Sequence, residues 1–270
     1  MDISICYMVR NEILKLPRSI HEMKGLGAQV CIVDTGSTDG TVEYAKSVAD
    51  KFARFKWCDD FSAARNKSLA LADGDWILVL DADEWIDKTY FPKIREIIKN
   101  PTAPVFVFQI LNFMQSPLWV EKPFILRGAS PRLFLRSKGY KYEGIVHNKL
   151  NVDDETMTRH TRFLTIYNFA YKERDDIVWK CEQNKKLMDI KVKEQGWTFE
   201  NCIHYSDIYR KLWTWKKDTK DGKRAVHYLN QALRIRSDVR MMQVRNFLLK
   251  EVQYVESKGN GQGDRQCRSA

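Results

Sequence analysis

Short apolar runs alternate with helical segments over the first hundred residues, and this alternation constrains the fold more than any other feature of the sequence. Each apolar run has the length of a β-strand and is followed by turn residues and a helical pattern. Strands of this kind pair in parallel and are covered by helices, so an α/β fold is predicted. The predicted strands are residues 3–9, 30–33, 52–57 and 76–80, and the predicted helices are residues 17–24, 41–49, 61–72 and 89–99.

The pattern changes after residue 100. Four strand-like segments follow one another without a helix between them, which favours a mixed or antiparallel extension of the sheet. They are residues 104–114, 132–136, 140–150 and 161–171. Four helices are then predicted, over residues 175–195, 199–215, 222–236 and 238–256. We therefore expect an α/β domain over residues 1–172, an all-helical region over 173–256 and a disordered polar tail over 257–270.

Composition excludes several classes of protein. The 270 residues are 44% hydrophobic and 30% charged, which is typical of a soluble globular chain. The longest strictly apolar run is five residues, whereas a membrane-spanning helix needs roughly 18. The N-terminus lacks the pattern of a signal peptide, and no pair of the six cysteines has CxxC spacing. A cytoplasmic protein with reduced thiols is expected.

The net charge of +10 is concentrated in two segments. Residues 1–100 carry a net charge of −2, whereas residues 101–150 carry +5 and residues 201–250 carry +8. Such an excess can attract an anionic partner, for example nucleic acid, a phosphorylated glycolipid or a membrane surface. A solvated basic helix face explains the charge equally well.

Carboxylates gather where the predicted strands end. Asp34 ends the second strand, Asp59 and Asp60 follow the third, and Asp81 and Asp83 follow the fourth. Ligands of open α/β sheets bind beyond the carboxyl ends of the strands. Carboxylates this dense repel each other unless a cation lies among them. The last pair can reach one Mg²⁺ or Mn²⁺, so the pattern predicts a metal-assisted nucleotide site, although such pairs also cap helices.

Five sequence blocks stand in order along the first 150 residues. They are MVRNE (8–12), VDTGSTDGT (33–41), DDFSAARN (59–66), GDWILVLDADE (74–84), and PRLFLR (131–136) with YEGIVH (142–147). Together they resemble the family 2 glycosyltransferases of GT-A fold, in particular the branch with C-terminal tetratricopeptide-like helices. The resemblance implies transfer of a sugar, with inversion, from a nucleotide-diphosphate donor to an acceptor hydroxyl. A UDP-sugar is the expected donor, and a divalent metal, Mn²⁺ or Mg²⁺, the expected cofactor.

The resemblance also implies roles for the matching residues. Asp34 would accept a hydrogen bond from the base, and Arg65 would contact the diphosphate unless it pairs with Asp34 or Asp81. The residues implied to bind the donor are Tyr7, Met8, Val9, Asn11, Glu12, Asp34, Thr35, Gly36, Arg65, Asp81, Ala82 and Asp83. Those implied to bind the metal are Asp81, Asp83 and His147.

The general base is less well indicated. Inversion needs a carboxylate or histidine within reach of the acceptor hydroxyl, and the candidates are Glu84, Glu143 and His147. We favour Glu84 because it adjoins the acidic pair, although a helix-capping or salt-bridge role explains it equally. The chain also departs from the branch at Asn148, where an acidic residue is usual, and at residues 168–171, which replace a His-Tyr-Gly-Tyr stretch.

Residues 205–239 resemble one degenerate tetratricopeptide unit with a turn at 218–222. One unit cannot stack into a solenoid, so it would pack on the catalytic domain or dock an acceptor or a second subunit. Basic and aromatic side chains near the turn can hold phosphates and stack bases. The candidate acceptor-binding residues are Lys211, Trp213, Trp215, Lys216 and Lys217. We favour the alternative, in which the tryptophans lie in the core under a solvated basic loop.

Two other functions stay open. A nucleotidyltransferase could use a similar sheet, although no Gly-rich, Lys-bearing loop follows the first strand. A non-enzymatic nucleic-acid-binding module would leave the acidic clusters merely structural. The acceptor of a glycosyltransferase could be a glycan or glycolipid, a peptide or a hydroxymethylated base in DNA. The sequence does not indicate the oligomeric state.

Overall fold

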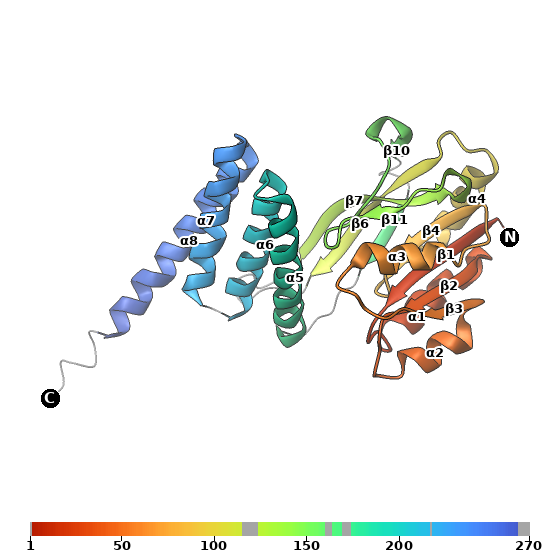
Figure 1. The fold of residues 1–270 in the computed structure, drawn as a ribbon, viewed down its shortest axis with the longest axis horizontal. Helices are drawn as coiled ribbons and strands as arrows, with labels where there is room; N and C mark the ends of the chain where they lie inside the picture. The colour runs from red at the N-terminus through yellow and green to blue at the C-terminus, as the bar shows by residue number, and fades with distance from the viewer. Residues whose placement is uncertain (1, 115–123, 160–163, 169–173, 217, 264–270) are drawn as a thin grey trace. The chain divides into compact units, whose positions relative to one another are not determined.

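The structure is a computed structural model that describes residues 2–114, 124–159, 164–168, 174–216 and 218–263. The described residues up to 168 form an α/β unit, and those from 174 onward form a helical unit (Figure 1). Among the described residues, no helix combines the length and the hydropathy needed to cross a bilayer.

The α/β unit is built on a nine-stranded mixed sheet whose first half is parallel. Strand β1 (Ile3–Val9) lies between β2 (Gln29–Asp34) and β4 (Trp76–Leu80), and β3 (Lys51–Arg54) pairs with the far side of β2. All five residues of β4 are buried, as expected for a strand covered on both faces. The carboxyl ends of β1, β2 and β4 lie at one edge of the sheet because these strands are parallel.

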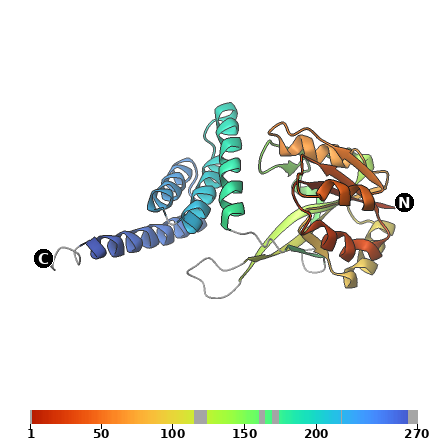
Figure 2. The same cartoon turned by 90° about the horizontal axis from the view of Figure 1, so that it is seen from below.

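The second half of the sheet is antiparallel in part. Strand β7 (Phe124–Leu135) runs antiparallel to β4 and to β6 (Val105–Met114), and these two long strands are easily followed in Figure 2. The edge is formed by β11 (Thr165–Asn168), which is parallel to β6, and β5 (Glu84–Ile86), which is antiparallel to β11. The predicted fold class, a mixed α/β sheet followed by helices, is confirmed.

One predicted strand is wrong. Residues 140–150 form a small separate hairpin of β8 (Tyr142–Glu143) and β9 (Lys149–Leu150). The loop between them turns at Gly144 and His147, which have φ angles of 100° and 52°. Positive φ is incompatible with a continuous strand. A short strand β10 (Met157–Arg159) pairs with β6.

Among the described α-helices of this unit, one begins at a side chain that caps it. Asp60 caps α3 (Phe61–Leu69) by accepting the backbone N–H groups of Ser62 and Ala63 at 2.7 and 3.1 Å. Pro17 lies in the first turn of α1 (Leu16–Met23). The described part of this unit also contains the α-helices α2 (Thr41–Val48) and α4 (Phe91–Lys99).

The helical unit contains α5 (Arg174–Gln195), α6 (Phe199–Lys216), α7 (Thr219–Ile235) and α8 (Val239–Gly263). Asp218 caps α7, so the predicted turn is shorter than residues 218–222 and Gly222 is helical. A Cβ atom at Gly222 would lie 2.7 Å from Val252 Cγ2, so glycine permits close packing of α7 and α8. The predicted end of the last helix at residue 256 is wrong, because α8 continues to Gly263. Residues 264–270 lie outside the described residues.

Candidate active site

The loops that follow β1 and β2 are tied together at the edge of the sheet. The backbone N–H of Asn11 donates to Ser37 Oγ at 2.8 Å, and Asn11 Oδ1 accepts the N–H of Thr38 at 2.8 Å. Asn11 has a φ of 52°, a region that asparagine tolerates better than most residues. The N–H of Glu12 donates to Thr41 Oγ1 at 2.9 Å. The MVRNE and VDTGSTDGT blocks therefore form one continuous surface.

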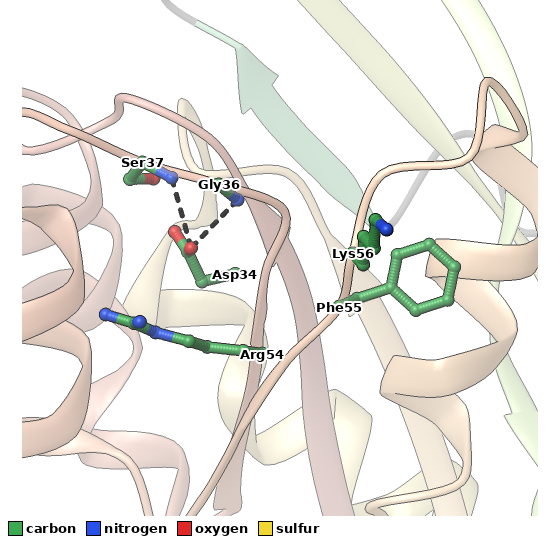
Figure 3. Close-up of a pocket in the computed structure, with 6 residues that line it drawn as sticks. All are labelled: Asp34, Gly36, Ser37, Arg54, Phe55 and Lys56. Carbon is green, nitrogen blue, oxygen red and sulfur yellow. Dashed lines mark hydrogen bonds between the residues drawn. The ribbon is translucent and has the colours of Figure 1, made fainter.

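Asp34 is a buried carboxylate at this surface, with only 1% of its area exposed. Its Oδ1 accepts the backbone N–H groups of Gly36 and Ser37 at 2.9 and 3.1 Å (Figure 3). Its Oδ2 is buried without a hydrogen-bond partner among the described residues. Leaving such an oxygen unpaired costs about 1–3 kcal/mol, so a ligand N–H that reached it would be favoured.

A cavity of about 290 Å³ adjoins this carboxylate. Figure 3 shows side chains from the ends of β2 and β3 around it. The lining residues are Asp34, Gly36, Ser37, Arg54, Phe55 and Lys56. The cavity thus combines a hydrogen-bond acceptor, an aromatic ring and two cations, which suits a planar ring carrying anionic substituents.

The carboxylates after β4 are neutralised by two arginines. Arg65 Nη2 lies 2.8 Å from Asp81 Oδ1, and Arg132 Nη2 lies 2.8 Å from Glu84 Oε1 and 4.0 Å from Asp81 Oδ2. The two guanidinium groups thus balance the charge of Asp81 and Glu84, and the divalent metal that the sequence predicted at Asp81 and Asp83 stays a prediction. The alternative role of Arg65, an ion pair with Asp81, is the one that the structure shows.

Burial and the facing charges together set the pKa values of this cluster. It raises the pKa of Glu84 to about 7, against the opposing effect of Arg132. Burial alone would lower the pKa of Arg65, but Asp81 raises it above its ordinary value. Nε and Nη1 of Arg65 and Nε of Arg132 are buried without partners among the described residues. Both oxygens of Glu84 are occupied, since Oε2 accepts the N–H of Asp81 at 2.9 Å, which speaks against Glu84 as the general base.

Asp83 has a different environment from Asp81. Its Oδ1 accepts a hydrogen bond from Asn168 Nδ2 at 3.2 Å, and Asn168 lies opposite Glu84 in the β11–β5 pair. No group of three or more His, Cys, Asp or Glu side chains that could hold a metal occurs within the described ranges. Mg²⁺ is usually held by one or two carboxylates together with water and substrate phosphates. These residues therefore suit a cation that is shared with a diphosphate rather than a site made of protein ligands alone.

The other predicted site residues differ in burial. The Tyr7 ring is buried in the core and its hydroxyl lies 3.1 Å from Ser19 Oγ, so its side chain cannot face a donor. The side chain of Val9 is buried too, and that of Met8 is half-buried. Glu143 and His147 are exposed on and beside the β8–β9 loop.

The predicted acceptor residues are mostly engaged within the helical unit. Lys211 pairs with Asp207 at 2.6 Å, and Lys216 pairs with Glu182 at 2.5 Å. Trp213 is buried, as the favoured alternative predicted, and Trp215 is half-buried. Lys217 lies outside the described residues.

Two residues of the site were given no role by the sequence. Arg132 was noted only as part of the PRLFLR block, and Asn168 only as a departure from the branch. Nothing local indicated that Asn168 would reach Asp83.

Comparison with known proteins decides the family. The profile of glycosyl transferase family 2 matches residues 3–159, more than half of the chain. The chain belongs to glycosyl transferase family 2. This membership agrees with the GT-A arrangement of the sheet. It favours a glycosyltransferase over the nucleotidyltransferase and the non-enzymatic module that the sequence left open.

Individual relatives match either a smaller part of this chain or match it at low sequence identity. A TPR repeat-containing protein of Synechococcus elongatus is 41% identical over 104 residues, which are 38% of this chain and 26% of the relative. The glycosyltransferase SunS of Bacillus subtilis is 26% identical over 202 residues, which are 71% of this chain and 46% of the relative. The chain thus spans less than half the length of these relatives. A crystal structure of S. aureus TarS 1–349 with UDP-GlcNAc is 13% identical and has a TM-score of 0.49, with 96% of this chain and 88% of that chain covered.

Proposed function

We propose that this chain transfers a sugar from a nucleotide-diphosphate donor, a UDP-sugar, to an acceptor hydroxyl with inversion. The observation that carries the proposal is the buried Asp34 carboxylate, which has an unpartnered oxygen and lines a cavity in a family 2 chain. A carboxylate accepts the ring N–H of uracil, and the Phe55 ring offers a face for stacking. Arg54 and Lys56 add positive charge to the same cavity, which suits an anionic ligand.

The Asp81–Asp83 turn would take the diphosphate end of the donor. Asp83 would hold Mn²⁺ or Mg²⁺ through the oxygen that Asn168 does not bond. Bound there, the metal supplies charge neutralisation of the leaving diphosphate. Asp81 is held by Arg65 and would face the ribose or a metal-bound water. His147 remains the candidate for a further ligand, because it is the only imidazole in the matched blocks.

Glu143 and His147 are the better candidates for the general base, since both are exposed whereas Glu84 is buried against Arg132. The base would accept the proton of the acceptor hydroxyl as the new glycosidic bond forms. The acceptor itself is a matter for experiment, with glycans or glycolipids, peptides and modified DNA as the classes to screen.

A thermal-shift panel tests the donor site. UDP, GDP, CDP, TDP and ADP are each added with Mn²⁺ or with EDTA. A ligand at about 100 times its dissociation constant stabilises the folded state by roughly 2.7 kcal/mol. We expect UDP with Mn²⁺ to stabilise the wild type and to have little effect on Asp83→Asn.

The control is Asp87→Asn, which changes an exposed carboxylate that accepts the N–H of Thr89 at 2.8 Å. This variant should respond to UDP as the wild type does. Absence of any metal-dependent shift in the wild type with all five nucleotides would contradict the proposed function.

A further inference from the structure

Strand β7 is irregular beside the acidic turn that follows β4. Against β6, Leu133 pairs with Phe106 and Pro131 pairs with Val107, so Arg132 is the extra residue of a β-bulge. Pro131 has no backbone N–H for the ladder, which suits a position next to a bulge. Bulges occur beside functional sites, where they redirect a side chain. The redirected side chain here is a guanidinium that is 9% exposed.

Arg132 contacts the chain on both sides of the acidic turn. Its Nη1 donates to the carbonyl of Val79, near the end of β4, at 3.3 Å. Its Nη2 donates to Oε1 of Glu84, at the start of β5, at 2.8 Å. The residues between these two contacts include Asp81 and Asp83. One guanidinium therefore joins the segment that enters the turn to the segment that leaves it.

The Glu84 carboxylate also makes a hydrogen bond within the acidic turn. Glu84 Oε2 accepts the N–H of Asp81 at 2.9 Å, and the N–H of Glu84 donates to the carbonyl of Asp81 at 3.0 Å. Arg132 holds Glu84, and Glu84 in turn holds the backbone of Asp81. This chain of contacts runs from the bulge to the residue that begins the turn.

We propose that Arg132 is a positioning residue of the donor site, delivered by the bulge in β7 to brace the Asp81–Asp83 turn through Val79 and Glu84. Both of its hydrogen bonds go to residues that flank the turn, so it acts on the donor site through the turn. The part of this inference that concerns the donor rests on the proposed function, whereas the brace itself does not.

The two contacts with Val79 and Glu84 require the planar guanidinium group of an arginine. Two guanidinium nitrogens reach two acceptors in fixed directions, whereas the ammonium of lysine is a single point charge on a flexible stem. Arg132→Lys therefore keeps the charge that neutralises Glu84 but loses one of the two contacts. The matched control is Arg136→Lys, because Arg136 directly follows β7 and donates Nε to the carbonyl of Gly74, away from the acidic turn, at 2.8 Å.

Two measurements on these variants test the proposal. Hydrogen exchange of the Asp81 and Glu84 amides should accelerate in Arg132→Lys and stay at the wild-type rate in Arg136→Lys. Loss of a residue that orients a metal ligand typically costs about 10–100-fold in affinity or activity. Calorimetry with UDP and Mn²⁺ should show a loss of this size for Arg132→Lys alone, with kcat reduced once an acceptor is known.

A double variant separates positioning from stability. Arg132→Met alone leaves the Glu84 carboxylate buried without its cation, and this variant could fail to fold. The double variant Arg132→Met/Glu84→Gln removes both charges together. The double variant should recover stability but not the affinity for UDP with Mn²⁺. Full recovery of affinity, or equal exchange rates in the two lysine variants, would overturn the proposal. If wild-type protein binds no nucleotide, the proposed function fails, and the exchange rates still decide whether the brace exists.

Discussion

The acidic edge of the sheet, around residues 81–84, and the basic turn of the helical unit, around residues 216–224, are both rich in charge. The two regions differ in how far their charged side chains are exposed. At the sheet, the side chains of Arg132 and Glu84 are 9% and 2% exposed. In the helical unit, those of Lys223 and Glu256 are 60% and 37% exposed. Exposed pairs contribute about 0–1 kcal/mol, whereas a buried charge that loses its partner is expensive. The comparison teaches that buried charged pairs fix the geometry of the sheet edge, whereas the exposed pairs of the helical unit mainly keep its surface hydrated.

The largest expected effect tests the buried side of this comparison. Arg132→Met should reduce the free energy of unfolding by about 3–5 kcal/mol, because Glu84 is left buried without its cation. Urea denaturation measures the change. Lys223→Met, the exposed counterpart, should cost no more than about 1 kcal/mol. Equal losses in the two variants would remove the distinction between the regions.

The next largest effect concerns ligand binding at the same edge. Asp34→Asn keeps the shape of the side chain but cannot offer two carboxylate oxygens to Gly36, Ser37 and a base. A hydrogen bond to a charged group is worth about 1.5–3 kcal/mol, so the affinity for UDP should fall roughly 10- to 150-fold. Titration calorimetry of UDP with Mn²⁺ gives the affinities.

Its control lies at the opposite end of the same strands. Asp50→Asn changes an exposed carboxylate that accepts the N–H of Val30 at 2.7 Å, and it should bind UDP as the wild type does. If Asp34→Asn also kept full affinity, Asp34 would not recognise the base.

The sequence predicted what depends on local pattern. The pattern of apolar and polar residues located β1, β4 and α3, because it arises from residues that are close in sequence. The β8–β9 hairpin was missed because its apolar residues continue through a turn that depends on the left-handed conformation of His147.

The candidate site was predicted less completely. The sequence predicted the position of Asp34, Asp81 and Asp83 at one edge of the sheet, because strand ends converge in a parallel sheet. The contacts of Arg132 with Glu84 and of Asn168 with Asp83 bridge 48 and 85 residues. Such contacts depend on strand order and on a bulge, and no short-range pattern in one sequence encodes either.

The pH dependence of stability tests a charged group of the helical unit, Asp207. Burial alone would raise the pKa of Asp207, but Lys211 and Arg210 lower it to about 2. A lowered pKa adds stability above the unfolded value near 4, and this stability is lost as the pH falls from about 4 to about 2. Since the Asp207 side chain is 36% exposed, solvent screening reduces the contribution to about 1 kcal/mol. Wild type and Asp207→Asn should therefore differ in stability at pH 6 and converge near pH 2.

The smallest expected effect belongs to the Lys216–Glu182 pair, whose side chains are 36% and 41% exposed at a separation of 2.5 Å. Solvent screens this pair and two long side chains must be ordered to form it. A double-mutant cycle with Lys216→Gln and Glu182→Gln should therefore give a coupling free energy of about 0.2–1 kcal/mol. Added salt should weaken the coupling further. Thermal or urea denaturation of the four proteins supplies the cycle. A coupling of several kcal/mol would show that the basic turn is as firmly organised as the sheet edge, and would return Lys216 to consideration as part of a built acceptor site.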